Sequence, residues 1–223
     1  HGKLLSLDLS AVEAAPGVLS VLTAIDIPGE NDISSTHKHD EPVFATSDIL
    51  HHGQPLFAVI AETREQARHA ALLARATYDE APPLLDVAAA RAAGSELVTE
   101  PLKLERGDVA SALANSPRRL KGTMAIGGQD HFYLESQISL AIPGEDQDML
   151  VLCSTQHPSE VQHMVANVLG VGSHAVMIEV RRMGGGFGGK ETQANLFACV
   201  AALAARKLKR PVKLRPDRDD DMV

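Results

Sequence analysis

A run of glycines near the end of the chain constrains this sequence more than any other feature. Residues 183–192 read Met-Gly-Gly-Gly-Phe-Gly-Gly-Lys-Glu-Thr, with five glycines in six positions. Alternating apolar residues predict a strand over 175–182, and the apolar pattern predicts a helix over 193–207. Glycines allow positive φ and bring backbone N–H groups close to a ligand, and a helix start favours anions or electron-rich groups. The loop therefore predicts a binding site for a polar ligand, with a plain tight turn as the alternative.

Two phosphate-binding patterns fit this loop in part, and each fails at particular residues. The dinucleotide pattern G-x-G-x-x-G needs an acidic residue about 20 positions later, where this chain has the basic run 205–210. Lys190 matches the P-loop pattern, but Glu191 replaces the hydroxyl residue that ligates magnesium and would repel phosphate. Glu191 beside several backbone donors instead indicates hydrogen bonding to a neutral or weakly acidic polar substrate.

A second junction of a strand and a helix lies upstream. Residues 150–155 predict a short apolar strand, and Gln156 and Pro158 follow it. The apolar residues between 161 and 169 have helical spacing, Pro158 suits the first helical turn, and Gly170 suits the helix end. Gln156 thus precedes a helix N-terminus, a common place for a ligand-facing side chain. A glutamine there can also do no more than cap the helix.

Several ordered motifs resemble the molybdenum-binding subunit of the xanthine dehydrogenases. Early segments within 15–23 and 53–61 fit this family as well, so the resemblance covers nearly the whole chain. The main motifs are Gly-Gly-Gln-Asp-His-Phe-Tyr-Leu-Glu at 127–135, Ser-Thr-Gln at 154–156, Arg-Met-Gly-Gly-Gly-Phe-Gly-Gly-Lys-Glu-Thr at 182–192 and Asp-Arg-Asp-Asp-Asp-Met at 217–222.

The expected fold is α+β, with two domains. By resemblance, an α/β hammerhead domain occupies 1–86, a linker occupies 87–103, and the N-terminal part of a molybdenum-cofactor-binding domain occupies 104–223. In the first domain we expect strands over 4–9, 18–24 and 56–61 and a helix over 64–76, with Thr63 and Gln66 as its capping box.

The resemblance implies a hydroxylase that oxidises purines, hypoxanthine and xanthine to urate, with oxygen derived from water and molybdenum held by molybdopterin. Gln156 matches the glutamine whose amide hydrogen bonds to an oxygen ligand of the metal. Phe187 matches the residue whose backbone lies beside the metal. The neighbouring Gly186, Gly188 and Gly189 are expected to offer N–H groups to the cofactor.

Glu191 matches the glutamate that hydrogen bonds to the purine and favours charge shifting onto its ring in the transition state. Aldehyde-oxidising relatives typically lack a glutamate here, so Glu191 favours purines. The general base of the family and a substrate-binding arginine are expected beyond Val223, so no catalytic residue is assigned within the chain. Because the chain also begins with His1, it is expected to be a fragment that is inactive alone.

Two alternative functions stay open. One is a relative that acts on another N-heterocycle or on an aldehyde, and the other is a non-catalytic assembly module that keeps the fold without the cofactor. No four-cysteine spacing for an iron–sulfur cluster is present in the sequence. Iron–sulfur and FAD centres are therefore expected on a partner subunit or on other segments, in a hetero-oligomer whose flavin-bearing part determines the final electron acceptor.

Composition restricts the partners and the compartment. The chain has 223 residues, 44% hydrophobic content and a net charge of −8, which together indicate a sizeable core and argue against a nucleic-acid surface. Cys153 and Cys199 are isolated in apolar runs, so a disulfide framework is not expected and a cytoplasmic location is favoured. No apolar run is long enough to predict a membrane span.

Two polar stretches do not predict metal sites. His37, His39, His51 and His52 lie in a region without cysteine or a helical i, i+4 pair, which indicates solvated loop histidines. The acidic run 217–221 lacks the spacing and the glycine of an EF-hand loop, and it is expected to face solvent or another subunit.

Overall fold

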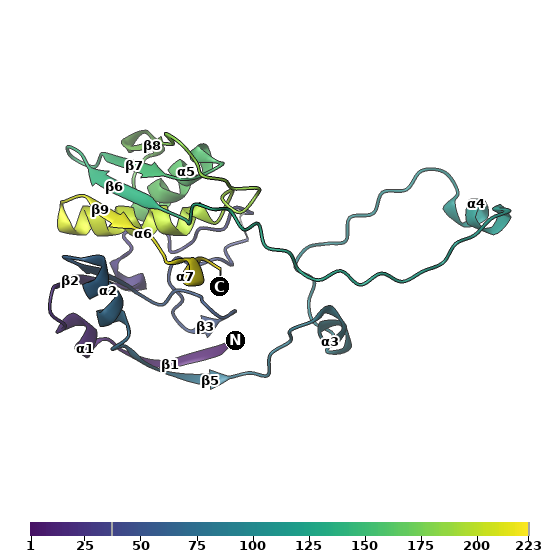
Figure 1. The fold of residues 1–223 in the computed structure, drawn as a ribbon, viewed down its shortest axis with the longest axis horizontal. Helices are drawn as coiled ribbons and strands as arrows, with labels where there is room; N and C mark the ends of the chain where they lie inside the picture. Colours follow the sequence, from purple (N-terminus) through teal and green to yellow (C-terminus); the bar gives the residue numbers. More distant parts are fainter. Residues whose placement is uncertain (37, 223) are drawn as a thin grey trace. The chain divides into compact units, whose positions relative to one another are not determined.

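The structure is a computed structural model that describes residues 1–36 and 38–222. Contacts within the chain divide it into two units, His1–Ala81 together with His131–Val223, and Pro82–Asp130. All the described strands lie in the first unit, as Figure 1 shows. The mixture of helices and antiparallel strands confirms the predicted α+β class.

The N-terminal part of the first unit contains two small antiparallel sheets. One sheet has the strand order β3-β1-β5, and the other pairs β2 with β4. A small core of Val12, Val21 and Ala70 joins the second sheet to two helices. The elements are β1 (Gly2–Asp8), α1 (Ser10–Glu13), β2 (Val18–Leu22), η1 (Ala24–Asp26), β3 (Asp48–Ile49), β4 (Ala58–Ala61), α2 (Arg64–Ala71) and β5 (Arg75–Glu80).

The helix expected over 64–76 is shorter than predicted. It ends at Ala71, and Arg75–Glu80 forms β5, which pairs with β1 in antiparallel register. Thr77 and Tyr78 have the side chains that strands favour, and Thr77 forms a hydrogen bond of 2.6 Å with Ser6 on β1. The pairing with β1 therefore includes Arg75 and Ala76, which were predicted to end the helix.

The predicted capping box at the start of α2 is confirmed. Thr63 Oγ1 accepts a hydrogen bond of 3.2 Å from the Gln66 N–H, and Gln66 Oε1 accepts one of 3.0 Å from the Thr63 N–H. We expect Thr63→Ala to destabilise this helix start by about 1 kcal/mol. Hydrogen exchange of the first α2 amides should then be roughly five-fold faster. Thr63→Ser, which keeps the acceptor, is the control, and equal exchange in both variants would contradict the prediction.

The C-terminal part of the first unit is a four-stranded sheet with two long helices. The strand order is β8-β7-β6-β9, with β7 and β8 parallel and the other pairs antiparallel. Figure 1 shows α6 running alongside this sheet. The elements are β6 (Ser139–Pro143), β7 (Met149–Cys153), α5 (Pro158–Leu169), η2 (Ser173–Ala175), β8 (Val176–Glu179), α6 (Ala194–Leu208), β9 (Val212–Leu214) and α7 (Arg218–Asp221).

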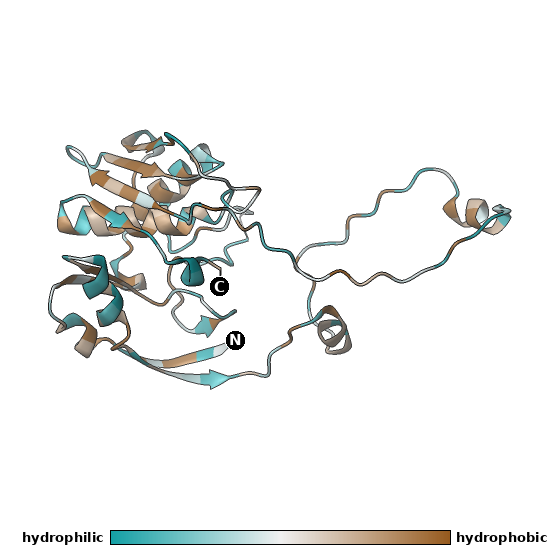
Figure 2. Cartoon of the chain, viewed as in Figure 1, coloured by the Kyte–Doolittle hydropathy of each residue, from teal (hydrophilic) through white to brown (hydrophobic). Residues whose placement is uncertain are grey.

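The main core lies between this sheet and the two long helices. Apolar residues of α5 recur at helical spacing and are fully buried, among them Val161, Val165 and Val168. The alanines of α6 are also buried, and small side chains allow its backbone to approach the sheet closely. Figure 2 shows hydrophobic colouring along these strands and helices. The predicted α5 is confirmed from Pro158 to its end, where Gly170 adopts the left-handed conformation.

The second unit, Pro82–Asp130, has little regular structure. It contains the short helices α3 (Val87–Ala92) and α4 (Val109–Asn115). Asp86 and Asp108 cap their N-termini by accepting hydrogen bonds from backbone N–H groups at 2.7 and 3.0 Å. Nearly all residues of this unit are exposed. The predicted linker 87–103 thus begins with a helical turn, and the domain boundaries at 86 and 104 stay a prediction.

Candidate functional site

The sheet topology brings Gln156 and the glycine loop together. Gln156 follows β7, and the loop follows β8. These two strands are parallel neighbours, so their carboxyl ends meet at the same edge of the sheet. The Gln156 N–H donates a hydrogen bond of 2.8 Å to the Lys190 carbonyl oxygen at the end of the loop. Segments that are far apart in the sequence therefore form one site.

The side chain of Gln156 is anchored by its carbonyl oxygen. Gln156 Oε1 accepts hydrogen bonds from the Gly188 N–H at 2.9 Å and from the Lys190 N–H at 3.3 Å. Only an oxygen can accept these bonds, so the amide orientation is fixed by chemistry. Among the described residues, Gln156 Nε2 has no acceptor. Gln156 does not cap α5 with its side chain, and the alternative that it only caps this helix is therefore wrong.

Two glycines are required for this arrangement. A Cβ at Gly186 would lie 2.5 Å from Gln156 Oε1, which is closer than side chains approach one another. Gly188 has a φ of +103°, a conformation that other residues rarely adopt. Phe187 between them is also left-handed, with φ at 54°, and its side chain is 75% exposed. A non-glycine residue held in this conformation is typical of functional sites.

The backbone donors of the loop are only partly free. The Gly188 N–H is used by Gln156, and the Gly189 N–H donates to the Gly186 carbonyl oxygen at 2.8 Å. Gln156 and the tight turn thus satisfy both groups internally, and the expected role of Gly188 and Gly189 in cofactor binding stays a prediction. In the described part of the chain, the N–H groups of Gly186 and Phe187 have no acceptor. These two donors and the Gln156 amide remain for a ligand.

Glu191 directly follows the loop and is exposed. Its carboxylate makes no hydrogen bond or ion pair with any residue that the structure describes. It differs in this from its neighbour Lys190, whose side chain is fully buried. Glu191 is therefore free to bind a molecule that approaches the loop from outside.

An ion pair beneath the loop, with a buried lysine and a partly exposed glutamate, was not predicted from the sequence. Lys190 Nζ lies 2.9 Å from Glu135 Oε2 and 2.8 Å from Ser154 Oγ, and it sits over the Tyr133 ring. Burial alone would raise the pKa of the Glu135 carboxyl, but hydrogen bonds from Ser154, Gly184 and Lys190 outweigh it and lower this pKa. The buried position gives a second reason why Lys190 does not serve as a P-loop lysine.

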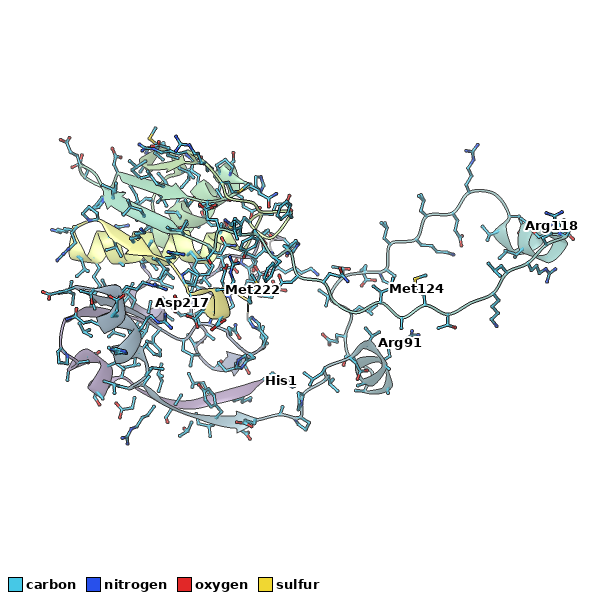
Figure 3. The ribbon with its side chains drawn as sticks, viewed as in Figure 1. His1, Arg91, Arg118, Met124, Asp217 and Met222 are labelled. Atoms are coloured by element: carbon cyan, nitrogen blue, oxygen red, sulfur yellow. The ribbon has the colours of Figure 1, made fainter. Side chains whose placement is uncertain are left out.

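The acidic run at 217–221 has partners within the chain. Asp217 pairs with Arg64 and Arg68 on α2, and Figure 3 labels Asp217 and Met222 on either side of α7. Asp221 Oδ2 accepts a hydrogen bond of 3.3 Å from the Gln137 N–H. The expectation that this run faces only solvent or another subunit is therefore wrong for Asp217 and Asp221, because it closes onto α2 and the segment before β6.

The described cysteines and histidines do not form a second site. Cys153 and Cys199 are free and buried, and burial raises the pKa of the Cys153 thiol to about 12. His39 Nδ1 lies 2.9 Å from Asp32, and His51 Nδ1 lies 2.9 Å from the His52 carbonyl oxygen. Among residues 1–36 and 38–222, there is no cluster of three or more His, Cys, Asp or Glu side chains that could hold a metal ion. His37 lies outside the described residues.

Two cavities lie away from the loop. One, of about 740 Å³, is lined by the β6–β7 turn and the start of α5, and another, of about 750 Å³, is lined by α2, β4, α6 and β9. Neither is lined by Gln156, Phe187 or Glu191. Within the described residues, none of the helices has the length and hydropathy needed to cross a membrane.

Both parts of the chain match known domain families. Residues 1–82 match the a/b hammerhead domain of aldehyde oxidase and xanthine dehydrogenase, and residues 92–223 match the molybdopterin cofactor-binding domain. The order of the two predicted domains is thereby confirmed.

Curated relatives are similar over the entire chain. The chain is 41% identical to a xanthine dehydrogenase of Dictyostelium discoideum over 222 residues, and 41% identical to a xanthine dehydrogenase/oxidase of Gallus gallus over 225 residues. Each alignment covers 100% of this chain and 16% of the relative. The chain therefore spans about one sixth of the length of these proteins.

Solved structures share the fold. Quinoline 2-oxidoreductase from Pseudomonas putida 86 superposes with a TM-score of 0.80 at 24% identity, over 99% of this chain and 30% of that one. Aldehyde oxidoreductase from Desulfovibrio gigas superposes with a TM-score of 0.86 at 22% identity, over 99% of this chain and 26% of that one.

Proposed function

Because the chain belongs to the xanthine dehydrogenase family of molybdenum hydroxylases, we propose that it forms part of an enzyme that hydroxylates purines. In the proposed reaction, water supplies the oxygen that replaces hydrogen on a purine carbon, and two electrons and two protons leave. Hypoxanthine and xanthine are the proposed substrates and urate is the product. The observation that carries this proposal is the exposed Glu191 carboxylate beside the glycine loop, which has no hydrogen-bond or ion-pair partner among the described residues.

The residues of the loop fit the molybdenum cofactor. The close approach of Gly186 to Gln156 leaves no room for a side chain, and the N–H groups of Gly186 and Phe187 have no acceptor among the described residues. We propose that these two donors and the Gln156 amide hold the cofactor, with Phe187 and Gln156 nearest the metal. When bound, the cofactor supplies the two-electron oxidation and the oxygen transfer. Gly188 and Gly189 would shape the loop against it.

Glu191 is the proposed purine-binding residue. A carboxylate accepts hydrogen bonds from ring N–H groups, and in its protonated form it donates to carbonyl oxygens. Negative charge that builds on a purine ring during attack would strengthen a hydrogen bond that a carboxyl O–H donates to the ring, which is how fixed polar groups accelerate a reaction. An aldehyde offers no ring N–H for this contact. Glu191 therefore favours purines over aldehydes.

The proposed redox partners are inferred from the small number of cysteines. The described residues contain only two cysteines, both buried inside the core. We propose that iron–sulfur and FAD centres on a partner subunit or on other segments receive the electrons, in a cytoplasmic hetero-oligomer. We place the hammerhead domain at 1–86, the linker at 87–103 and the cofactor domain at 104–223.

A metal analysis and a substrate panel on the full-length protein test this function. We expect molybdenum at about one atom per chain, and xanthine and hypoxanthine to be oxidised in preference to quinoline and an aromatic aldehyde. Preference for quinoline or the aldehyde would replace the purine proposal with the alternative substrate class. Absence of molybdenum from the full-length protein would favour the non-catalytic assembly module.

The 223 residues alone are expected to hydroxylate nothing. Phe187 and Glu191 of the loop are exposed, and the chain spans 16% of the first relatives, so most cofactor contacts are expected from other segments. Purified alone, the chain should contain little molybdenum and give no urate from xanthine. Measurable turnover of xanthine by this chain would contradict the prediction.

A further inference from the structure

One carboxylate oxygen links three separate segments beneath the glycine loop. Glu135 Oε2 accepts a hydrogen bond from the Gly184 N–H at 3.1 Å, from the Lys190 ammonium at 2.9 Å, and from the Ser154 hydroxyl. Gly184 is near the start of the loop, Lys190 is at its end, and Ser154 follows β7. Glu135 therefore fixes both ends of the loop and the strand end that carries Gln156.

Burial makes this pairing obligatory. The Lys190 side chain is 0% exposed, whereas that of Glu135 is 40% exposed. Lys190 Nζ also donates to Ser154 Oγ at 2.8 Å and lies 4.9 Å from the centre of the Tyr133 ring. A buried ammonium without a counter-charge is strongly unfavourable. A neutral apolar residue could fill the same space, so stability alone does not explain a charged pair at this position.

The Lys190 backbone connects the pair to Gln156. The Lys190 carbonyl oxygen accepts hydrogen bonds from the Gln156 N–H at 2.8 Å and from Thr155 Oγ1 at 3.2 Å. The Lys190 N–H donates to Gln156 Oε1 at 3.3 Å. A displacement of Lys190 would therefore move Gln156 and release one of the two bonds that orient its amide.

A second buried side chain, Gln137, also holds the loop from below. Gln137, which is fully buried, donates through Nε2 to the Gly189 carbonyl oxygen at 2.9 Å and to the Tyr133 hydroxyl at 3.1 Å. The end of the loop is thus held from below at Gly189 as well as at Lys190. The outer surface of the loop, with Phe187 and Glu191, makes no comparable contacts with the described residues.

We propose that Glu135 and Lys190 are positioning residues, which hold the glycine loop so that the N–H groups of Gly186 and Phe187 and the Gln156 amide face the cofactor. They act through the loop and touch neither substrate nor cofactor. This inference rests on the proposed cofactor site, but it concerns the order of the loop before any cofactor binds. It can therefore fail independently of the purine proposal.

The test uses full-length protein with both charges removed. Glu135→Gln or Lys190→Met alone leaves an unpaired charge in or near the core, so each single variant is expected to be unstable. The double variant Glu135→Gln/Lys190→Met keeps similar volumes and leaves no unpaired charge. Asp26→Asn/Lys207→Met is the matched control, because it removes another ion pair, of 2.6 Å, away from the loop. Ser154→Ala removes one donor without unpairing a charge.

Loop order is read from cofactor-free protein by hydrogen exchange of the amides at Gly188 and Lys190. We expect the double variant to melt close to the control, and these amides to exchange roughly tenfold faster than in the control. Ser154→Ala should give a smaller increase. In protein supplied with cofactor, the double variant should lose about 10²-fold in kcat with KM little changed, since misplacement of reacting groups has effects of this size.

Three results would overturn the proposal. The first is loop exchange in the double variant equal to that of the control, and the second is unaltered kcat at matched molybdenum content. The third is a double variant that does not fold, which would assign the pair to global stability. In contrast, faster loop exchange in a protein that prefers aldehydes would support the positioning role and count against the purine proposal.

Discussion

Gln156→Ala in the full-length enzyme is expected to lower turnover by roughly 10² to 10³, which corresponds to about 2.7–4 kcal/mol. The side-chain oxygen of Gln156 already accepts hydrogen bonds from the N–H groups of Gly188 and Lys190. The NH₂ group is therefore the only polar part of the side chain left to act on a ligand. An amide that donates to a ligand of the metal would stabilise charge that develops there. Alanine removes this donor.

Gln156→Glu is the matched control, because it removes the amide N–H donor and keeps the side-chain oxygen that holds the loop. A carboxylate still accepts from the Gly188 and Lys190 N–H groups, but it has no N–H to donate. We expect similar losses of turnover in both variants, with greater loop exchange only in Gln156→Ala. The measurements are kcat, molybdenum content and melting temperature on the same preparations. Unaltered turnover with a lowered melting temperature would limit Gln156 to a structural role.

Local patterns predicted the elements that flank the site. The helical spacing of Val161, Val165 and Val168 and the stop at Gly170 gave α5, because these signals depend only on neighbouring residues. The glycine loop was predicted between a strand and a helix for the same reason, and it lies between β8 and α6. The roles of Gln156, Phe187 and Glu191 come from the family resemblance and stay predictions.

These local patterns could not predict contacts between residues that are far apart in the sequence. Arg75 and Ala76, the first residues of β5, were predicted as the end of a helix, since only their pairing with β1 distinguishes them from α2. Glu135 and Lys190 are separated by 55 positions, and their immediate neighbours do not show that the two side chains pair. The glycine loop was expected to offer the N–H groups of Gly186, Gly188 and Gly189 to the cofactor. Its own turn and Gln156 use two of them, a detail that depends on exact backbone geometry.

Glu191→Val should separate purine recognition from support of the loop. Glu191 is exposed and makes no contact with the described residues that the loop would lose, so valine should leave the loop and the cofactor content intact. Purine turnover is expected to fall by roughly 10², because a group that hydrogen bonds to the developing charge is removed. An aromatic aldehyde needs no such bond and should lose much less. The effect is therefore a change in the ratio of two kcat/KM values.

The measurement is kcat/KM for xanthine and for an aromatic aldehyde, in wild type and variant, at matched molybdenum content. Glu191→Gln is the second variant, because it keeps polar groups but removes the charge. If hydrogen bonding alone matters, glutamine should retain much of the purine activity, and if the charge matters, it should resemble valine. Equal losses for xanthine and the aldehyde in Glu191→Val would mean that Glu191 supports the loop or the cofactor and does not bind the purine. The buried Lys190 already has Glu135 as its counter-charge. If Glu191 had a structural role, its partner would therefore have to lie outside the described residues.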